Sequence, residues 1–277
     1  MPILHKKILC PLSQKSYNLL KNKYFCAKIR EGGVPLKYKR DSAFLEKGDR
    51  LMRIVYKNRH VVIIDKPAGM PAQSDPTGDT DAMTETERAL REAKEPSSLW
   101  LVHRLDRPVR GLMVFARSKS AAAEISRIIT EGGFDKRYLA VCRGCADGGL
   151  YRDFLYKDAK QNKAFVVDRK RAGVKEAELY AYPVSYTEKA GKGMTLLSVK
   201  LITGRFHQIR VQLASRKTPL IGDKKYGDTD KETRFPALIS ARIAFTLFGS
   251  EISVSLPMPK DEYPWGFFEV NENELFE

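Results

Sequence analysis

Residues 101–116 read Leu-Val-His-Arg-Leu-Asp-Arg-Pro-Val-Arg-Gly-Leu-Met-Val-Phe-Ala. Two apolar segments typical of strands are separated here by a polar break, and functional sites are commonly built at strand ends. Asp106 stands between Arg104 and Arg107, whose positive charges favour its ionised form. An ionised aspartate can act as a nucleophile or as a base. From these residues alone the break is either a catalytic loop or a salt-bridged turn.

The chain has 277 residues, of which 43% are hydrophobic and 10% aromatic, so it can bury a core and is not a disordered chain. It carries 49 Lys/Arg against 34 Asp/Glu, a formal net charge of +15. Such an excess favours a nucleic acid partner over a charge that serves solubility alone. The longest aliphatic run, Val61–Ile64, is far shorter than the ~18 residues of a membrane-spanning helix. We expect a cytoplasmic protein with no membrane association.

A second polar cluster follows an apolar segment and a Thr-Gly turn, in Thr203-Gly-Arg205-Phe-His207-Gln208-Ile-Arg210-Val-Gln-Leu-Ala214. At helical spacing His207 and Arg210 share a face, three residues apart. The planar guanidinium of Arg210 can bind a carboxylate through two hydrogen bonds. His207 is a candidate general base, but at a helix start it is more often a hydrogen-bonding residue.

Two shorter segments add candidate residues. Lys136-Arg-Tyr138 opens an apolar segment, and Tyr138 offers a flat face for stacking and a phenol for proton transfer, although most strand tyrosines only pack. Asp65-Lys66-Pro-Ala-Gly69 forms a tight turn after the Val61–Ile64 run. Cys142 and Cys145 have the spacing of half a zinc site, but the sequence holds no second pair, so we expect no metal.

The order of elements favours a strand-rich α+β fold rather than a doubly wound parallel sheet, because regular βαβ alternation is missing. We expect helices over 81–93, 120–130 and 206–214, with Ser118 as a candidate cap of the second. Strands are expected over 60–65, 99–102, 111–116, 137–143, 164–167, 177–182, 195–201, 237–248 and 252–256.

Together these segments, in this order, resemble the RluA-type branch of RNA pseudouridine synthases over about residues 60–256. The match rests on Val61–Gly69, on His103–Ala116, on Lys136–Ala140 and on Thr203–Val211, followed by Pro219-Leu-Ile-Gly-Asp223-Lys-Lys-Tyr226-Gly. The resemblance implies a mixed, mainly antiparallel central sheet with flanking helices and a central RNA-binding cleft. Phe206 and Ser240 depart from the residues common at their positions in the family.

The implied reaction isomerises a uridine within structured RNA, and it consumes no cofactor and no metal. The N1–C1′ bond breaks, the uracil turns, and its C5 bonds to C1′. By motif position Asp106 matches the catalytic aspartate, Arg210 its ion-pair partner, and Tyr138 the aromatic residue against the base. Candidate RNA contacts are Arg104, His103, Arg107, Lys66, Arg205, His207 and Gln208. The residues leave open whether Asp106 bonds to the sugar or assists formation of a glycal.

Residues 1–56 differ from the rest and are expected to form a basic N-terminal extension, with the catalytic domain over 57–277. Residues 1–57 hold 14 Lys/Arg and 4 Asp/Glu. The segment from Ile29 to Leu51 resembles only the closing part of an S4 RNA-binding domain, in a degenerate or partial form.

The sequence thus predicts a monomeric pseudouridine synthase whose partner is RNA, ribosomal RNA before transfer RNA. The alternative is a non-catalytic RNA-binding or ribosome-assembly protein of the same fold. The retained Asp106, Tyr138 and Arg210 count against this alternative. A third alternative, a nuclease or deaminase, is disfavoured, because the sequence has neither a metal-ligand set nor the H-x-E with P-C-x-x-C signature.

Overall fold

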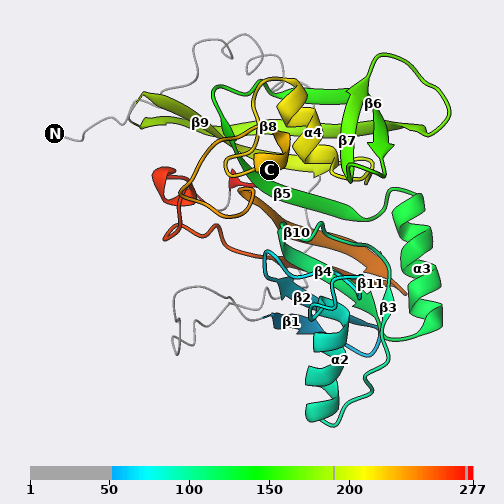
Figure 1. Cartoon of the computed structure of the whole chain (residues 1–277). Helices are drawn as coiled ribbons and strands as arrows, with labels where there is room; N and C mark the ends of the chain where they lie inside the picture. The colour runs from blue at the N-terminus through cyan, green and yellow to red at the C-terminus, as the bar shows by residue number, and fades with distance from the viewer. Residues whose placement is uncertain (1–51, 190, 272–273, 277) are drawn as a thin grey trace. The chain divides into compact units, whose positions relative to one another are not determined.

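The computed structural model describes residues 52–189, 191–271 and 274–276 (Figure 1). The described chain divides into two compact units. We call residues 52–136 with 239–256 the Asp106 unit, and residues 137–238 with 257 onward the Arg210 unit. Each is named after the predicted site residue that it carries.

The Asp106 unit is built on β1 (Arg53–Lys57), β2 (Val61–Lys66), β4 (Arg110–Ala116) and β10 (Leu238–Leu247), which pair in that order. β10 runs parallel to β4, whereas the other pairs are antiparallel, including β3 (Trp100–Leu101) with β4 and β11 (Ser250–Ser255) with β10. Every residue of β2, and all of β4 after Arg110, is buried. Strands buried on both faces read as continuous apolar runs, which explains the two runs that flank the polar break.

Two helices complete this unit. α2 (Ala82–Glu92) begins after Asp81, whose carboxylate accepts a hydrogen bond from the Thr84 amide. α3 (Lys119–Thr130) contacts β3 and β4 and begins after Ser118, whose hydroxyl accepts from the Ala121 amide at 3.1 Å. Each cap satisfies an amide that a helix start leaves without an intrahelical partner. The predicted role of Ser118 is confirmed.

The Arg210 unit contains an antiparallel sheet in the order β5-β9-β8-β6-β7. The strands are β5 (Asp135–Arg143), β6 (Gly149–Asp158), β7 (Lys163–Val167), β8 (Val174–Lys189) and β9 (Lys192–Leu201). α4 (Gln208–Ser215) contacts β6 and β7, and a small core joins them through Leu155, Ala164 and Val211. Two short 3-10 helices, η1 (Lys224–Tyr226) and η2 (Trp265–Phe267), follow.

The α+β class and the mainly antiparallel pairing are confirmed, and the three helices lie within two residues of their expected bounds. β6 was not predicted. Its inward positions, Tyr151 and Leu155, are four residues apart, while Leu150 and Tyr156 are exposed, so the alternation that marks a strand is weak.

The predicted boundary at residue 56 falls inside β1, which pairs with β2, while the S4-like segment lies outside the described residues. Within the described ranges, no helix is both long and apolar enough to cross a membrane. The same ranges hold no group of three or more His, Cys, Asp or Glu side chains placed to bind a metal ion.

Candidate active site

Asp106 lies in a loop, residues 102–109, that leads from β3 to β4. The Val109 amide donates to the Asp106 carbonyl at 2.9 Å, which closes a tight turn around the aspartate. At the start of the loop the backbone leaves the β3–β4 ladder, and from there the side chain of His103 makes the contact with β4. Its Nε2 atom accepts a hydrogen bond from the Val114 amide of β4 at 3.0 Å. The loop is therefore bound to β4 at its start by His103 and closed by a turn before β4 begins.

The same loop is bound to the turn after β2 by reciprocal hydrogen bonds. The Gly69 amide donates to the Arg107 carbonyl at 2.8 Å, and Arg107 Nε donates to the Gly69 carbonyl at 2.9 Å. The Arg107 guanidinium also donates to Thr77 at 3.1 Å and forms an ion pair with Asp79. The structure therefore brings the first predicted motif against the loop of Asp106.

Lys66 joins these two segments from inside. Its side chain is fully buried, and Nζ donates to the carbonyls of Pro67 at 2.9 Å, Met70 at 2.8 Å and Arg107 at 3.3 Å. Burial lowers the pKa of Lys66 to about 7, while the carboxylates of Asp106 and Asp65 act to raise it. Lys66 thus holds the loop backbone, and it is not exposed to RNA.

His103 is held in its neutral form. Burial lowers its pKa to about 3, and the charge of Lys136 acts in the same direction. Because Nε2 accepts from Val114, the proton of the neutral ring is on Nδ1. Among the described residues Nδ1 is buried and has no hydrogen-bond partner. His103 therefore anchors the loop as an acceptor.

Gly111 lets β4 approach β10 closely. Its φ is +116°, and a Cβ placed there would lie 2.4 Å from the Ser240 carbonyl oxygen. Gly111 pairs with Ser240 in the parallel ladder and with Lys66 in the antiparallel one. Only glycine combines this φ with this approach.

In the Arg210 unit, Arg210 is 4% exposed and is bound by a carboxylate of the same unit. Its Nε and Nη2 donate to the two oxygens of Asp223 at 2.7 and 2.8 Å. The guanidinium carbon also lies 5.1 Å from the centre of the Tyr226 ring. Asp223 and Tyr226 belong to the Pro219–Gly227 segment, to which the sequence assigned no role.

His207 and Gln208, at the start of α4, face the protein interior. His207 is 7% exposed, its Nδ1 lies 2.9 Å from the Tyr226 hydroxyl, and burial lowers its pKa to about 3. Gln208 is 3% exposed and accepts from the Thr203 hydroxyl and the Arg205 amide at 2.8 and 2.9 Å. Both side chains fix the helix start, so neither is part of the RNA surface proposed below.

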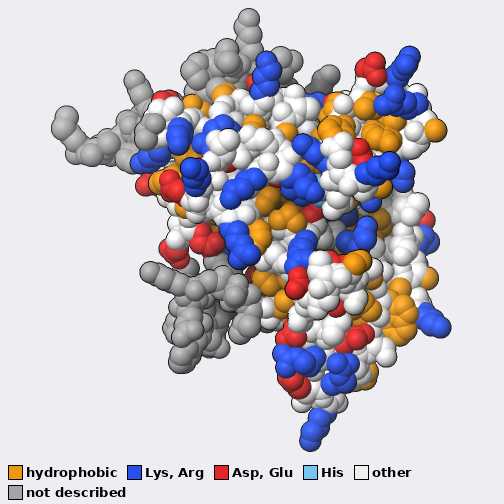
Figure 2. Space-filling view, in the orientation of Figure 1, with side chains coloured by type: hydrophobic (Ala, Val, Ile, Leu, Met, Phe, Trp, Pro, Cys, Tyr) orange, Lys and Arg blue, Asp and Glu red, His pale blue; other side chains and the backbone are white. Residues whose placement is uncertain are grey.

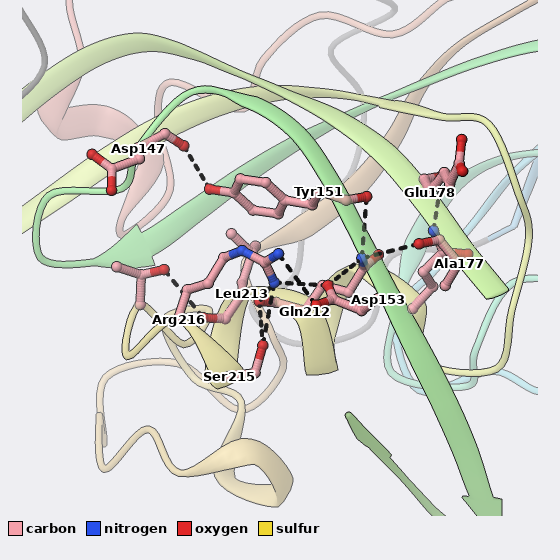
Figure 3. Close-up of polar contacts among 11 residues, drawn as sticks. Asp147, Tyr151, Asp153, Ala177, Glu178, Gln212, Leu213, Ser215 and Arg216 are labelled. Carbon is pink, nitrogen blue, oxygen red and sulfur yellow. Dashed lines mark hydrogen bonds and ion pairs between the residues drawn. The ribbon is translucent and has the colours of Figure 1, made fainter. Parts of the chain in front are cut away.

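Polar contacts hold the rest of α4 against β6 (Figure 3). Gln212 Nε2 donates to Asp153 at 2.7 Å, and Arg216 pairs with the same carboxylate at 2.8 Å. The Arg216 guanidinium also stacks on Tyr151, 4.0 Å from the ring centre. Arg210 therefore projects from a helix fixed along its length.

The remaining predicted residues differ in exposure. Tyr138 lies in β5 opposite Val199 and is 6% exposed, whereas Arg104 and Arg205 are exposed. Figure 2 shows basic side chains over the surface that carries β6 to β8. Residues 156–175 alone hold seven Lys/Arg and two Asp.

Comparison with known proteins gives a family model described as RNA pseudouridylate synthase, which matches residues 60–215. The ribosomal large subunit pseudouridine synthase C of Buchnera aphidicola is 32% identical over 178 residues, covering 63% of this chain and 53% of that protein. The tRNA pseudouridine synthase C of Vibrio cholerae is 27% identical, covering 75% of this chain and 86% of that protein.

A solved human structure, RNA pseudouridylate synthase domain containing 1, has a TM-score of 0.66 at 20% identity, covering 78% of this chain and 87% of its own. This likeness confirms the expected fold. The chain spans about half the length of the Buchnera protein.

Proposed function

Since this chain belongs to the RNA pseudouridylate synthase family, we propose that it converts uridine to pseudouridine within RNA, with Asp106 as the catalytic carboxylate. This proposal rests on the hydrogen bonds that hold the Asp106 loop to β4 and to the turn after β2. A reacting carboxylate needs a fixed position, because small displacements from the reactive geometry cost rate.

In the proposed reaction the N1–C1′ bond of the target uridine breaks and positive charge develops at C1′. Asp106 either attacks C1′ or takes a proton in a glycal route, and either route needs the carboxylate ionised. Arg210 is the proposed cationic residue of the same reaction. The target nucleotide leaves its stack, and Tyr138 lies against the base. The detached uracil stays bound, turns, and bonds to C1′ through C5.

The proposed substrate is ribosomal RNA, with transfer RNA second, because relatives named for both kinds of RNA match this chain. Arg104 and Arg205, which are exposed, and the basic surface over residues 156–175 contact the phosphates. Arg107 and His103 contribute to RNA binding indirectly, because their hydrogen bonds hold the loop that carries Asp106 and Arg104. The protein works as a monomer in the cytoplasm, without a membrane.

The test compares the wild type with Asp106→Asn. We expect the variant to bind RNA like the wild type and to form no pseudouridine. The substrate is RNA from a strain that lacks the gene, and chemical adduct mapping detects the product. Glu251→Gln, which changes an exposed carboxylate on β11, outside the proposed RNA contacts, is the control and keeps full activity. Product formation by Asp106→Asn at the wild-type rate refutes the assignment.

The same strain tests the alternative function. A full set of pseudouridines in the deletion strain, together with accumulating ribosome assembly intermediates, would favour a non-catalytic assembly protein.

A further inference from the structure

The carboxylate of Asp223 holds the guanidinium of Arg210 by its Nε–Nη2 edge, and both side chains are almost fully buried, at 1% and 4% exposure. We propose that Asp223 is a positioning residue for catalysis: it holds the guanidinium of Arg210, the proposed catalytic cation, in one orientation. This role rests on the proposed function. A two-point contact fixes both the position and the plane of a guanidinium, which a single hydrogen bond does not.

Asp223 can do this because its own backbone is fixed. Its amide donates to the Leu220 carbonyl at 3.0 Å, and its carbonyl accepts from the amides of Tyr226 and Asp228 at 3.0 and 3.2 Å. The preceding Gly222 has a φ of +79°, and a Cβ there would lie 2.5 Å from the Phe235 carbonyl oxygen. The turn therefore has one arrangement, and the carboxylate that it carries is a rigid partner.

A second contact from the same turn supports this orientation. Tyr226 lies three residues after Asp223, and its ring centre is 5.1 Å from the Arg210 guanidinium carbon. The Tyr226 hydroxyl accepts from the Ala164 amide at 2.9 Å and lies 2.9 Å from His207 Nδ1. The turn thus contacts Arg210 through a carboxylate and an aromatic ring, and it binds β7 and the helix start.

Charge explains why a carboxylate is needed. An arginine stays protonated in proteins, so a buried guanidinium needs a compensating anion. Without Asp223, the buried guanidinium would keep its charge and lose the carboxylate that fixes its plane. With Asp223 present, the charge of Arg210 is compensated within its own unit.

The same turn offers a matched control. Asp230 is also a buried carboxylate, 8% exposed, and it pairs with Arg143 at 3.2 Å and accepts from the Tyr263 hydroxyl at 2.6 Å. Asp230→Asn therefore removes a buried carboxylate that contacts an arginine in the same segment, while Arg143 keeps its ion pair with Asp228 and Arg210 is not touched. A loss that reflects only a loosened segment affects both variants alike.

The experiment measures kcat and KM on RNA for the wild type, Asp223→Asn, Asp230→Asn, Arg210→Lys and the double variant Asp223→Asn with Arg210→Lys. We expect Asp223→Asn to lower kcat about 10- to 100-fold, as a misplaced catalytic group does, with KM changed less than about threefold. Asp230→Asn keeps kcat within about twofold. Because Asp223 acts through Arg210, adding Asp223→Asn to Arg210→Lys lowers kcat by less than about twofold.

Three results overturn the proposal: a wild-type kcat in Asp223→Asn, an equal loss of kcat in Asp230→Asn, or independent, multiplying losses in the double variant. If Asp223→Asn does not fold, Asp223→Glu carries the test, since it keeps the charge and displaces the carboxylate by one methylene. We expect it to fold and to lose kcat, and an unchanged kcat refutes the role. A wild type that forms no pseudouridine refutes the proposed function instead.

Discussion

Replacing Lys66 by Met tests whether this lysine supports the Asp106 loop from inside or contacts RNA. Methionine has a similar length and no charge, so it fills the space of the side chain but donates no hydrogen bond. The change removes the donor that Lys66 gives to the carbonyls of Pro67, Met70 and Arg107. The Arg107 carbonyl keeps its hydrogen bond from the Gly69 amide, so the carbonyls of Pro67 and Met70 are the two that lose their donor.

A buried acceptor that loses its donor costs about 1–3 kcal/mol. Two such carbonyls would cost about 2–6 kcal/mol, but removing a buried ammonium offsets part of this, because burial disfavours the charged form. We therefore expect Lys66→Met to lower the free energy of unfolding by about 2–4 kcal/mol at pH 7.

The difference should grow with pH. The pKa of Lys66 is about 7 in the folded protein, below its value of about 10.4 in an unfolded chain. Between these values the unfolded state binds more protons, so Lys66 makes the wild type more stable as pH rises through this window. From pH 7 to pH 9 the gain is about 2 kcal/mol, at no more than about 1.4 kcal/mol per pH unit. The Met variant lacks this gain.

Urea unfolding at pH 7, 8 and 9 measures the effect, with Lys119→Met, at an exposed position, as the control. RNA binding measured over a range of salt concentrations completes the assay, since each phosphate contact contributes about 0.7–0.9 to the slope of log affinity against log salt. Unchanged stability together with a slope reduced by about one would show that Lys66 binds RNA and would refute the reasoning.

Three further predictions concern the fold. Gly111→Ala should lower the free energy of unfolding by more than about 3 kcal/mol in a urea titration, since a Cβ would strain the backbone and meet Ser240 at 2.4 Å; a loss under about 1 kcal/mol would contradict the close approach. Because the folded pKa of His207 is about 3, below about 6.5 in the unfolded chain, its contribution to stability should be lost as pH drops below 6.5, by about 2 kcal/mol at pH 5. His103 adds a loss of the same sign in both proteins, so His207→Gln should lose about 2 kcal/mol less than the wild type between pH 7 and pH 5, and equal losses would refute the His207 contribution. Ser118→Ala should cost about 1 kcal/mol by removing the cap of α3, while Ser120→Ala, beside it, should cost much less.

The sequence predicted the Asp106 loop because its residues are contiguous. The apolar runs of β2 and β4, the glycine after Arg110 and the charges around Asp106 all fall within short windows, where period and composition can be read directly. β6 was missed for the converse reason, since its burial is decided by β7 and β8 on either side and not by its own alternation.

Contacts between distant residues were not predictable in the same way. Lys66 and Arg107 are 41 positions apart, and the exposure of a lysine cannot be read from its neighbours in the chain. A lysine is usually exposed, so an RNA contact was the natural expectation. Asp223 and Arg210 lie in separate elements, and only the fold places the carboxylate on the guanidinium. The sequence supplied the residue types, and the tertiary structure decided which of them pair.

Two unfavourable features of the Asp106 unit lie around the loop of Asp106. The ammonium of Lys66 is desolvated, and Nδ1 of His103 is buried without a partner among the described residues. Each costs stability, and such a cost persists only where the contacts of the surrounding structure hold the residue in place. The buried strands β2 and β4 do so here, and these costs maintain one position for the Asp106 carboxylate, which in the proposed function reacts at a sugar carbon. A protein that only bound RNA would have no need for this rigidity, because phosphate contacts tolerate movement that bond formation at C1′ does not.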